Sequence, residues 1–204
     1  MVSRYTPASQ YPRTNGHGIS QILFGDDEAL RDRVGLARRK HALAIGAQEA
    51  SGFDGDEAKA IEQHRRGTGG EIAVLRASPV PLLWRELPTG WGQPDLIAPN
   101  GIKIDVKTRP GDDLPMLVQR DKPPDPGQTE IEARRRRIRF HQDWIYFLVS
   151  DECKPAYLLR GWCYGRAIGP ELLWEGSRDD GECYKVPDKL LRPWHEFVRE
   201  LRGT

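Results

Sequence analysis

The residues best suited to chemistry lie around the turn sequence Pro99-Asn100-Gly101, which joins two runs of alternating apolar residues. Asp95 precedes this turn, and Asp105 and Lys107 follow it. Carboxylate oxygens are the ligands that Mg²⁺ and Mn²⁺ prefer. An amine beside them can stabilise charge on a phosphate ester or help to deprotonate water. The stretch from 92 to 109 is therefore predicted to be a metal-binding β-hairpin.

The length of the turn decides whether the two aspartates meet, because a register slip of one residue moves every side chain to the opposite face. A two-residue loop at Asn100-Gly101 would place Asp95 opposite Val106, and the two aspartates would diverge. Pro99 at the second position of a type I turn instead favours a three-residue loop, with the glycine in the left-handed conformation. Asp95 is then opposite Asp105, with Cβ atoms about 4.5 to 5.5 Å apart, so that one ion could bridge both carboxylates.

This register gives the hairpin a polar face and an apolar face. The polar face would carry Asp95, Ile97, Lys103, Asp105 and Lys107. The apolar face, which is expected to be buried, would carry Leu96, Ala98, Ile102, Ile104 and Val106. The backbone carbonyl of Val106 would supply a further metal ligand.

A glutamate on the preceding helix is the next candidate. Glu71 follows Gly67-Thr68-Gly69-Gly70 in a helix predicted over 56–77, and His64 lies two turns earlier on the same side. Three glycines inside a helix cost roughly 1 kcal/mol each relative to alanine, so a close contact with a sheet, a metal or a phosphate should compensate for them. Otherwise they would mark a break between two short helices, and Glu71 would be an ordinary exposed glutamate.

Together these residues resemble the PD-(D/E)XK nuclease superfamily. Pro94-Asp95, nine further residues and Asp105-Val106-Lys107 match its central motif. Gly67-Thr68-Gly69-Gly70-Glu71 matches the Gly-x-x-Gly-Glu form that several branches carry. The resemblance spans about residues 57–165 and implies a restriction-endonuclease-like core.

The same resemblance implies a Mg²⁺-dependent deoxyribonuclease, with Mn²⁺ expected to substitute and DNA as the partner. It assigns the binding of one or two divalent ions to Glu71, Asp95 and Asp105, and assistance of water attack to Lys107. The sequence leaves open endonucleolytic or exonucleolytic action, the DNA structure or sequence recognised, DNA against RNA, and the biological pathway.

The expected fold is α/β, with a mixed central β-sheet flanked by helices and an N-terminal helical extension. Residues 1–24 are predicted to form an irregular arm, and residues 25–204 a single nuclease-like domain. We divide this domain into a helical lead-in at 25–55, a catalytic core at about 56–165, and a C-terminal strand and helix at 166–204. Further elements are expected as a short strand or turn within 79–90, a strand or loop at 114–119, a helix at 128–140, buried strands at 143–150 and 156–165, an edge strand at 182–186 and a helix at 190–201.

Basic residues that could contact DNA are unevenly distributed. A formal net charge of +1 argues against a protein that coats nucleic acid indiscriminately. The densest basic run is Arg134-Arg135-Arg136-Arg137, which we expect to contact DNA together with His64 and Gln119. The clusters at 38–41 and 64–66 are weaker and fit either solvated helix faces or phosphate contacts.

One further match is discounted. Gln142 and Tyr146 have the spacing of a Gln-x-x-x-Tyr signature that some branches of the superfamily carry on a helix. Tyr146 lies in a run rich in β-branched and aromatic residues, which predicts a strand. The two side chains would therefore not share a helical face.

Composition bounds the alternatives. No apolar run reaches the length of a membrane span and the N-terminus lacks the apolar stretch of a signal peptide, so we expect a cytoplasmic protein without a membrane partner. Three cysteines without C-x-x-C spacing favour free thiols over a zinc site. Two other functions stay open, namely a catalytically silent nucleic-acid-binding or assembly protein with the same fold, and a zinc-stabilised module using the cysteines with His141 or His195. The oligomeric state is open too, a homo-oligomer included.

Overall fold

The computed structural model describes residues 19–22, 25–44, 56–87, 93–111, 114–120, 140–153, 156–175 and 182–203. The helices are α1 (Asp26–Ala44), α2 (Glu57–Ala77) and α4 (Trp194–Arg202). The strands are β1 (Ile19–Ile22), β2 (Leu83–Trp84), β3 (Leu96–Ile97), β4 (Lys103–Arg109), β5 (Met116–Gln119), β6 (Ile145–Cys153), β7 (Ala156–Tyr164), β8 (Leu173–Glu175) and β9 (Glu182–Val186). Short 3₁₀ helices occupy Gly165–Ala167, Pro170–Leu172 and Asp188–Leu190.

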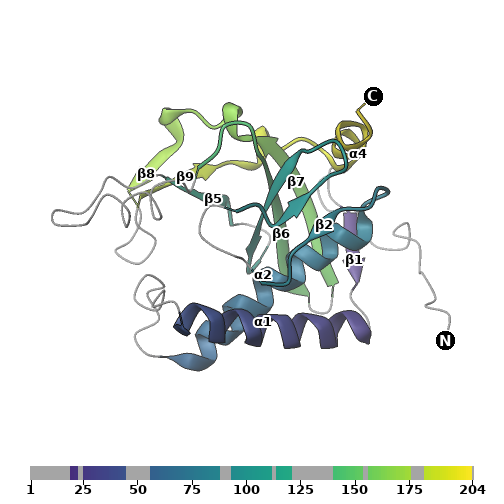
Figure 1. The fold of residues 1–204 in the computed structure, drawn as a ribbon. Coiled ribbons are helices and arrows are strands. Elements are labelled where there is room, and N and C mark those ends of the chain that lie inside the picture. The colour runs from purple at the N-terminus through teal and green to yellow at the C-terminus, as the bar shows by residue number, and fades with distance from the viewer. Residues whose placement is uncertain are drawn as a thin grey trace.

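The strands form two sheets, and the fold is α/β as the sequence predicts (Figure 1). The larger sheet has six strands in the order β1-β7-β6-β4-β3-β2. It is mixed, because β4 and β6 run parallel while the other neighbours run antiparallel. The smaller sheet is antiparallel, in the order β5-β9-β8.

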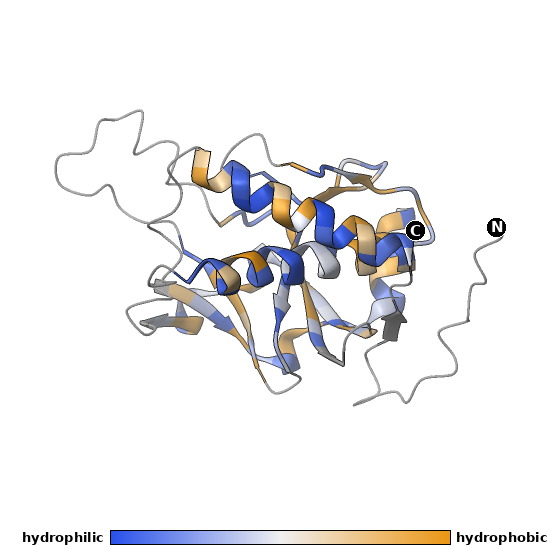
Figure 2. Cartoon of the chain, turned by 90° about the horizontal axis from the view of Figure 1, so that it is seen from below, coloured by the Kyte–Doolittle hydropathy of each residue, from blue (hydrophilic) through white to orange (hydrophobic). Residues whose placement is uncertain are grey.

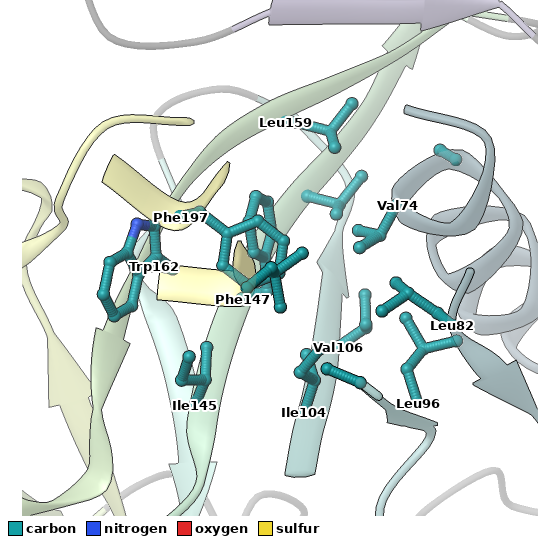
Figure 3. Packing of buried hydrophobic residues seen from close by; sticks show 14 of the residues in the cluster. Val74, Leu82, Leu96, Ile104, Val106, Ile145, Phe147, Leu159, Trp162 and Phe197 are labelled. Atoms are coloured by element: carbon teal, nitrogen blue, oxygen red, sulfur yellow. The ribbon is translucent and has the colours of Figure 1, made fainter. Parts of the chain in front are cut away.

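The two faces of the larger sheet are covered differently. On one face, α2 and α4 pack against alternate residues of the strands, including Val106 and Phe147, and form the larger hydrophobic core (Figure 3). On the other face, the small sheet contributes Met116, Val118 and Val186 to a second core. The N-terminal helices pack on the large sheet as a pair, with α1 lying across α2 (Figure 1). Helix α1 carries hydrophilic and hydrophobic residues mixed along its length (Figure 2).

Helix α2 runs without a break through its glycines. A Cβ at Gly69 would collide with the ring of Tyr157, and a Cβ at Gly70 would collide with the hydroxyl of Thr108. The glycines therefore let the helix backbone lie directly against β7 and β4. Of the alternatives that the sequence leaves open, the structure shows close contact with a sheet and not a helix break.

The hairpin has the predicted turn. Leu96 pairs with Ile104 and Ile97 with Lys103, and the Gly101 N–H donates to the carbonyl of Ala98 at 2.9 Å. Gly101 has a φ of 84°, so the loop has three residues with its glycine in the left-handed region. On the predicted core face, Leu96, Ala98, Ile104 and Val106 are buried and Ile102 is partly buried against them.

The turn is also tied to the end of the chain, which the sequence does not predict. The side-chain amide of Asn100 donates to the carbonyls of Glu200 and Leu201, at 3.2 and 3.3 Å. Helix α4 therefore packs on the core and holds the loop that fixes the hairpin register.

Several expected elements differ from the structure. Ile19–Ile22 lie in the predicted irregular arm but form strand β1 at the edge beside β7. Glu182–Val186 was expected at an edge, but β9 is the middle strand of the small sheet, between β5 and β8. Strand β8 was not predicted, and the small sheet, not a helix, covers the second face within the described residues. The helix predicted at 128–140 lies outside the described residues, except for Phe140, which is not helical.

Among the described residues, no helix combines the length and the apolar character that crossing a membrane requires.

Candidate active site

Asp95 stands at the start of the hairpin and is bonded to β4 twice. Its N–H donates to the carbonyl of Ile104 at 3.0 Å, and its Oδ2 accepts from the N–H of Val106 at 2.7 Å. The paired register of the hairpin ends at Leu96 opposite Ile104, so Asp95 lies one residue before β3 and is held to β4 by these two bonds. Because the N–H and C=O of one strand residue point to the same side, the Val106 carbonyl faces the same gap beyond the end of β3.

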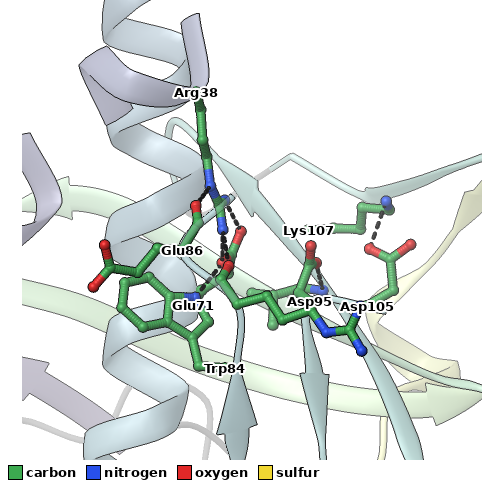
Figure 4. Close-up of polar contacts among 9 residues, drawn as sticks. Arg38, Glu71, Trp84, Glu86, Asp95, Asp105 and Lys107 are labelled. Carbon is green, nitrogen blue, oxygen red and sulfur yellow. Dashed lines mark hydrogen bonds and ion pairs between the residues drawn. The ribbon is translucent and has the colours of Figure 1, made fainter. Parts of the chain in front are cut away.

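Asp105 and Lys107 come from β4 and share a face, since side chains two residues apart in a strand point the same way. Lys107 Nζ lies 2.6 Å from Asp105 Oδ1, and the two side chains point toward one another (Figure 4). The Lys107 side chain is 29% exposed and the Asp105 side chain is 13% exposed, so the pair is shielded but still reached by solvent. The structure therefore brings Asp95, Asp105 and Lys107 together, as the sequence predicts.

Glu71 reaches the same region from α2 and is 3% exposed. Arg38 Nη1 donates to its Oε1 at 2.5 Å, and Arg38 Nη2 donates to its Oε2 at 2.7 Å. Trp84 Nε1 also donates to Oε2, at 2.7 Å. Both carboxylate oxygens are thus engaged by protein donors, and Asp95 lies between Glu71 and Asp105 (Figure 4).

Arg38 holds more than Glu71. Its Nη2 also donates to the carbonyl of Arg85 at 3.0 Å, and its Nε donates to the carbonyl of Glu86 at 2.8 Å. The guanidinium therefore links α1, α2 and the segment after β2. From the sequence, Arg38 belongs to a weak basic cluster, and no pattern predicts its contact with Glu71. The contact of Trp84 with Glu71 is not predicted either. The available signal is that Arg38 lies one helical turn after Val34, which is buried in the packed side of α1.

The electrostatics reflect three crowded carboxylates. Burial, followed by the negative charges of Glu71 and Asp105, raises the pKa of Asp95 well above its usual range. Burial opposes the charged form of Arg38, but Glu71, Asp95 and Glu86 outweigh it and raise the Arg38 pKa. The pKa of Lys107 is likewise raised, because Asp105 and Asp95 outweigh the effect of burial. The cluster is therefore a place where positive charge is stabilised.

The donor set fits one hard divalent ion. Asp95, Asp105 and the Val106 carbonyl offer oxygen atoms around one gap, and Mg²⁺ is commonly held by one or two carboxylates with water completing its shell. Within the described ranges, no three carboxylate, imidazole or thiol side chains form a ready metal cage. Glu71, predicted as a direct ligand, is turned to Arg38 and Trp84 in this arrangement.

No family model and no curated protein sequence matches the chain. Function is therefore inferred from the geometry of these residues.

The predicted DNA-contacting residues do not gather at one place in the described structure. His64 is half-buried in α2, and burial, followed by the charges of Arg39 and Arg38, lowers its pKa. Gln119 ends β5 on the small sheet, opposite Cys183. The run at 134–137 lies outside the described residues.

The two weaker basic clusters are largely occupied by acidic partners of the same chain. Besides Arg38 with Glu71, the structure pairs Arg39 with Glu57 at 2.6 Å, Arg66 with Asp151 at 2.8 Å and Arg65 with Asp32 at 3.7 Å. These arginines therefore serve first to join α1, α2 and β6.

The discounted Gln-x-x-x-Tyr match is resolved by the structure. Gln142 lies in a turn, whereas Tyr146 is buried in β6 and its hydroxyl accepts from the N–H of His141 at 2.8 Å. The two side chains share no helical face.

The two cysteine side chains that the structure describes, Cys163 and Cys183, are buried and are not joined in a disulfide bond. Burial raises the pKa of Cys163 to about 12. Within the described residues, neither cysteine belongs to a group of three histidine, cysteine, aspartate or glutamate side chains that could hold a metal ion.

Proposed function

We propose that the protein is a metal-dependent nuclease that hydrolyses DNA phosphodiester bonds at Asp95, Asp105 and Lys107, with Glu71 in support. The observation that carries this proposal is the bond from the Val106 N–H to Asp95, which fixes one carboxylate beside the strand that bears Asp105 and Lys107. The mixed sheet and the closely packed α2 agree with the PD-(D/E)XK resemblance.

Each residue has a distinct task. Asp95, Asp105 and the Val106 carbonyl would hold Mg²⁺ or Mn²⁺. When bound, such an ion lowers the pKa of water and neutralises charge on the phosphate. The Lys107 ammonium group, held against Asp105 at 2.6 Å, is placed to stabilise charge that develops on the phosphate oxygens. The Glu71 carboxylate, which Arg38 and Trp84 hold in place, adds negative charge behind Asp95.

The reaction is attack of water on phosphorus. The bond between phosphorus and the 3′ oxygen breaks, the water oxygen stays on phosphorus, and the leaving oxygen takes up a proton. The products are a 5′-phosphate and a 3′-hydroxyl, as the resemblance implies.

A second candidate is a catalytically silent nucleic-acid-binding or assembly protein that retains the fold. The observation that favours it is the full engagement of Glu71 by Arg38 and Trp84. A carboxylate used in this way stabilises the packing of α1 on α2 without any reaction.

The test is cleavage of linear duplex, single-stranded, branched and supercoiled DNA with Mg²⁺, with Mn²⁺ or with EDTA. EDTA should abolish cleavage, and Asp105→Ala and Lys107→Ala should each lower it by at least about 10²-fold. Lys103→Ala is the matched control, because it removes an amine from the same face of β4. Cleavage that persists in both site variants would place the active site elsewhere. Binding of DNA without cleavage of any substrate would favour the silent protein.

A further inference from the structure

The cluster at the candidate site contains three carboxylates and two fixed positive groups. Asp95 interacts with both Glu71 and Asp105, while Arg38 is bonded to Glu71 and Lys107 to Asp105. With every group ionised, the five side chains sum to a single negative charge. One divalent ion would reverse that sign, and a second would add to an excess of positive charge.

The two ends of the cluster are not equally open to a cation. At the Glu71 end, Arg38 makes two bonds to the carboxylate and two more to the backbone carbonyls of Arg85 and Glu86. Its side chain is 12% exposed and that of Glu71 is 4% exposed. At the Asp105 end, a single flexible amine contacts one oxygen.

We propose that Arg38 takes the place of a second cation, so that the site binds one divalent ion at its Asp95 and Asp105 end. This proposal rests on the proposed function. Arg38 is a positioning residue here: its planar fork fixes the Glu71 carboxylate, and its charge, which also acts on Asp95, lowers the affinity of the cluster for metal. Lysine at this position would keep the charge but could not make the paired bonds.

The test is calorimetric titration of the metal-free full chain with Mn²⁺, without DNA. The wild-type protein should bind one ion. Arg38→Met should bind Mn²⁺ about tenfold more tightly or take a second ion, because a positive charge is removed from the cluster. Arg38→Lys should stay within about threefold of the wild-type affinity, because the charge remains.

Two further variants separate charge from folding. The double variant Arg38→Met/Glu71→Gln removes one charge of each sign, so it should return to the wild-type affinity and bind one ion. Arg33→Met is the matched control, because Arg33 also lies on α1 but forms an exposed pair with Glu86. It should leave the affinity unchanged.

Two ions in the wild-type protein would overturn the proposal, as would an unchanged affinity in a folded Arg38→Met. If Arg38→Met does not fold, two ions in the double variant would overturn it equally. One ion in every variant at the same affinity, together with Mg²⁺-dependent cleavage, would reject the role of Arg38 and keep the nuclease. No Mn²⁺ binding by the wild-type protein, together with no cleavage, would instead reject the proposed function.

Discussion

Two ion pairs border Asp95, and they are built in different ways. Arg38 and Glu71 are joined by two hydrogen bonds between helices and are nearly buried. Lys107 and Asp105 come from one strand, share a single contact of 2.6 Å and are more exposed. The first pair is held by packing from several segments, whereas the second is held mainly by the alternation of one strand.

We expect the two pairs to have different roles, with Arg38 and Glu71 supporting the fold and Lys107 and Asp105 taking part in the reaction. An arginine fork held by four bonds has little freedom to follow a reacting group, whereas an amine on a flexible stem can move with one. We therefore expect loss of the first pair to act mainly on stability, and loss of the second mainly on cleavage.

The largest expected effect is on folding. Arg38→Met should lower the free energy of unfolding by about 3 to 5 kcal/mol, because it leaves the Glu71 carboxylate buried without its partner. Arg33→Met breaks an exposed pair and should cost less than about 1 kcal/mol. Urea unfolding followed by circular dichroism measures both. Equal losses would show that the Arg38 pair is no more structural than a surface pair.

Lys107→Met should behave in the opposite way. Cleavage should fall by about 10² to 10³, the cost of removing one group that stabilises transition-state charge. Stability should change by less than about 1 kcal/mol, since the pair is partly exposed. Single-turnover rates and urea unfolding of the same sample measure the two quantities. A stability loss as large as that of Arg38→Met would erase the contrast between the pairs.

The position of one pair relative to the other depends on the glycines of α2. Gly70→Ala would place a methyl group against the Thr108 hydroxyl and 3.2 Å from its Cβ, pushing Glu71 away from β4. We expect a loss of about 1 to 3 kcal/mol in stability, as for other overpacked sites. Gly67→Ala is the control, because nothing lies within 4 Å of its added Cβ, and it should raise stability by up to about 1 kcal/mol. Thermal unfolding of both variants measures the difference.

The smallest expected effect is a pH dependence near the Arg38 pair. The pKa of His64 is lowered by burial and by the charges of Arg39 and Arg38. The unfolded chain takes up this proton near pH 6.5, while the folded chain does so at lower pH. The contribution of His64 to stability is therefore fully present above about pH 6.5, and it is lost as the pH falls through the lower pKa of the folded chain. In Arg38→Met the His64 pKa should rise toward its ordinary value, as NMR titration of the imidazole would measure. An unchanged pKa would show that Arg38 makes no contribution and that burial and Arg39 lower it.

The part of the site that could be predicted from the sequence is the part governed by local rules. The Pro99-Asn100-Gly101 turn and strand alternation predict the three-residue loop and the shared face of Asp105 and Lys107. The same rules identify the buried face of the hairpin and the strands β6 and β7. These features depend on neighbours within a few residues.

The rest depends on contacts between distant segments. Arg38 lies in a basic run of the kind usually found on a solvated face, and only the crossing of α1 over α2 brings it to Glu71. Ile19–Ile22 is a short segment that follows a stretch of polar and small residues. Its strand character therefore depends on the edge that β7 offers. The middle position of β9 follows from partners on both sides, β5 and β8, which its own sequence does not reveal.

The pairing of β1 with β7 also determines when the larger sheet can be completed during synthesis. Ile19 pairs with Leu159 and Ile22 with Ala156, so this strand closes a loop that contains α1, α2 and the whole hairpin. During synthesis β1 has no partner until β7 has left the ribosome. Contacts so distant in the chain are slow to form, because the entropy of closing a long loop is lost before the contacts are gained. The nascent chain would therefore finish its sheet only after every residue of the candidate active site has already been made.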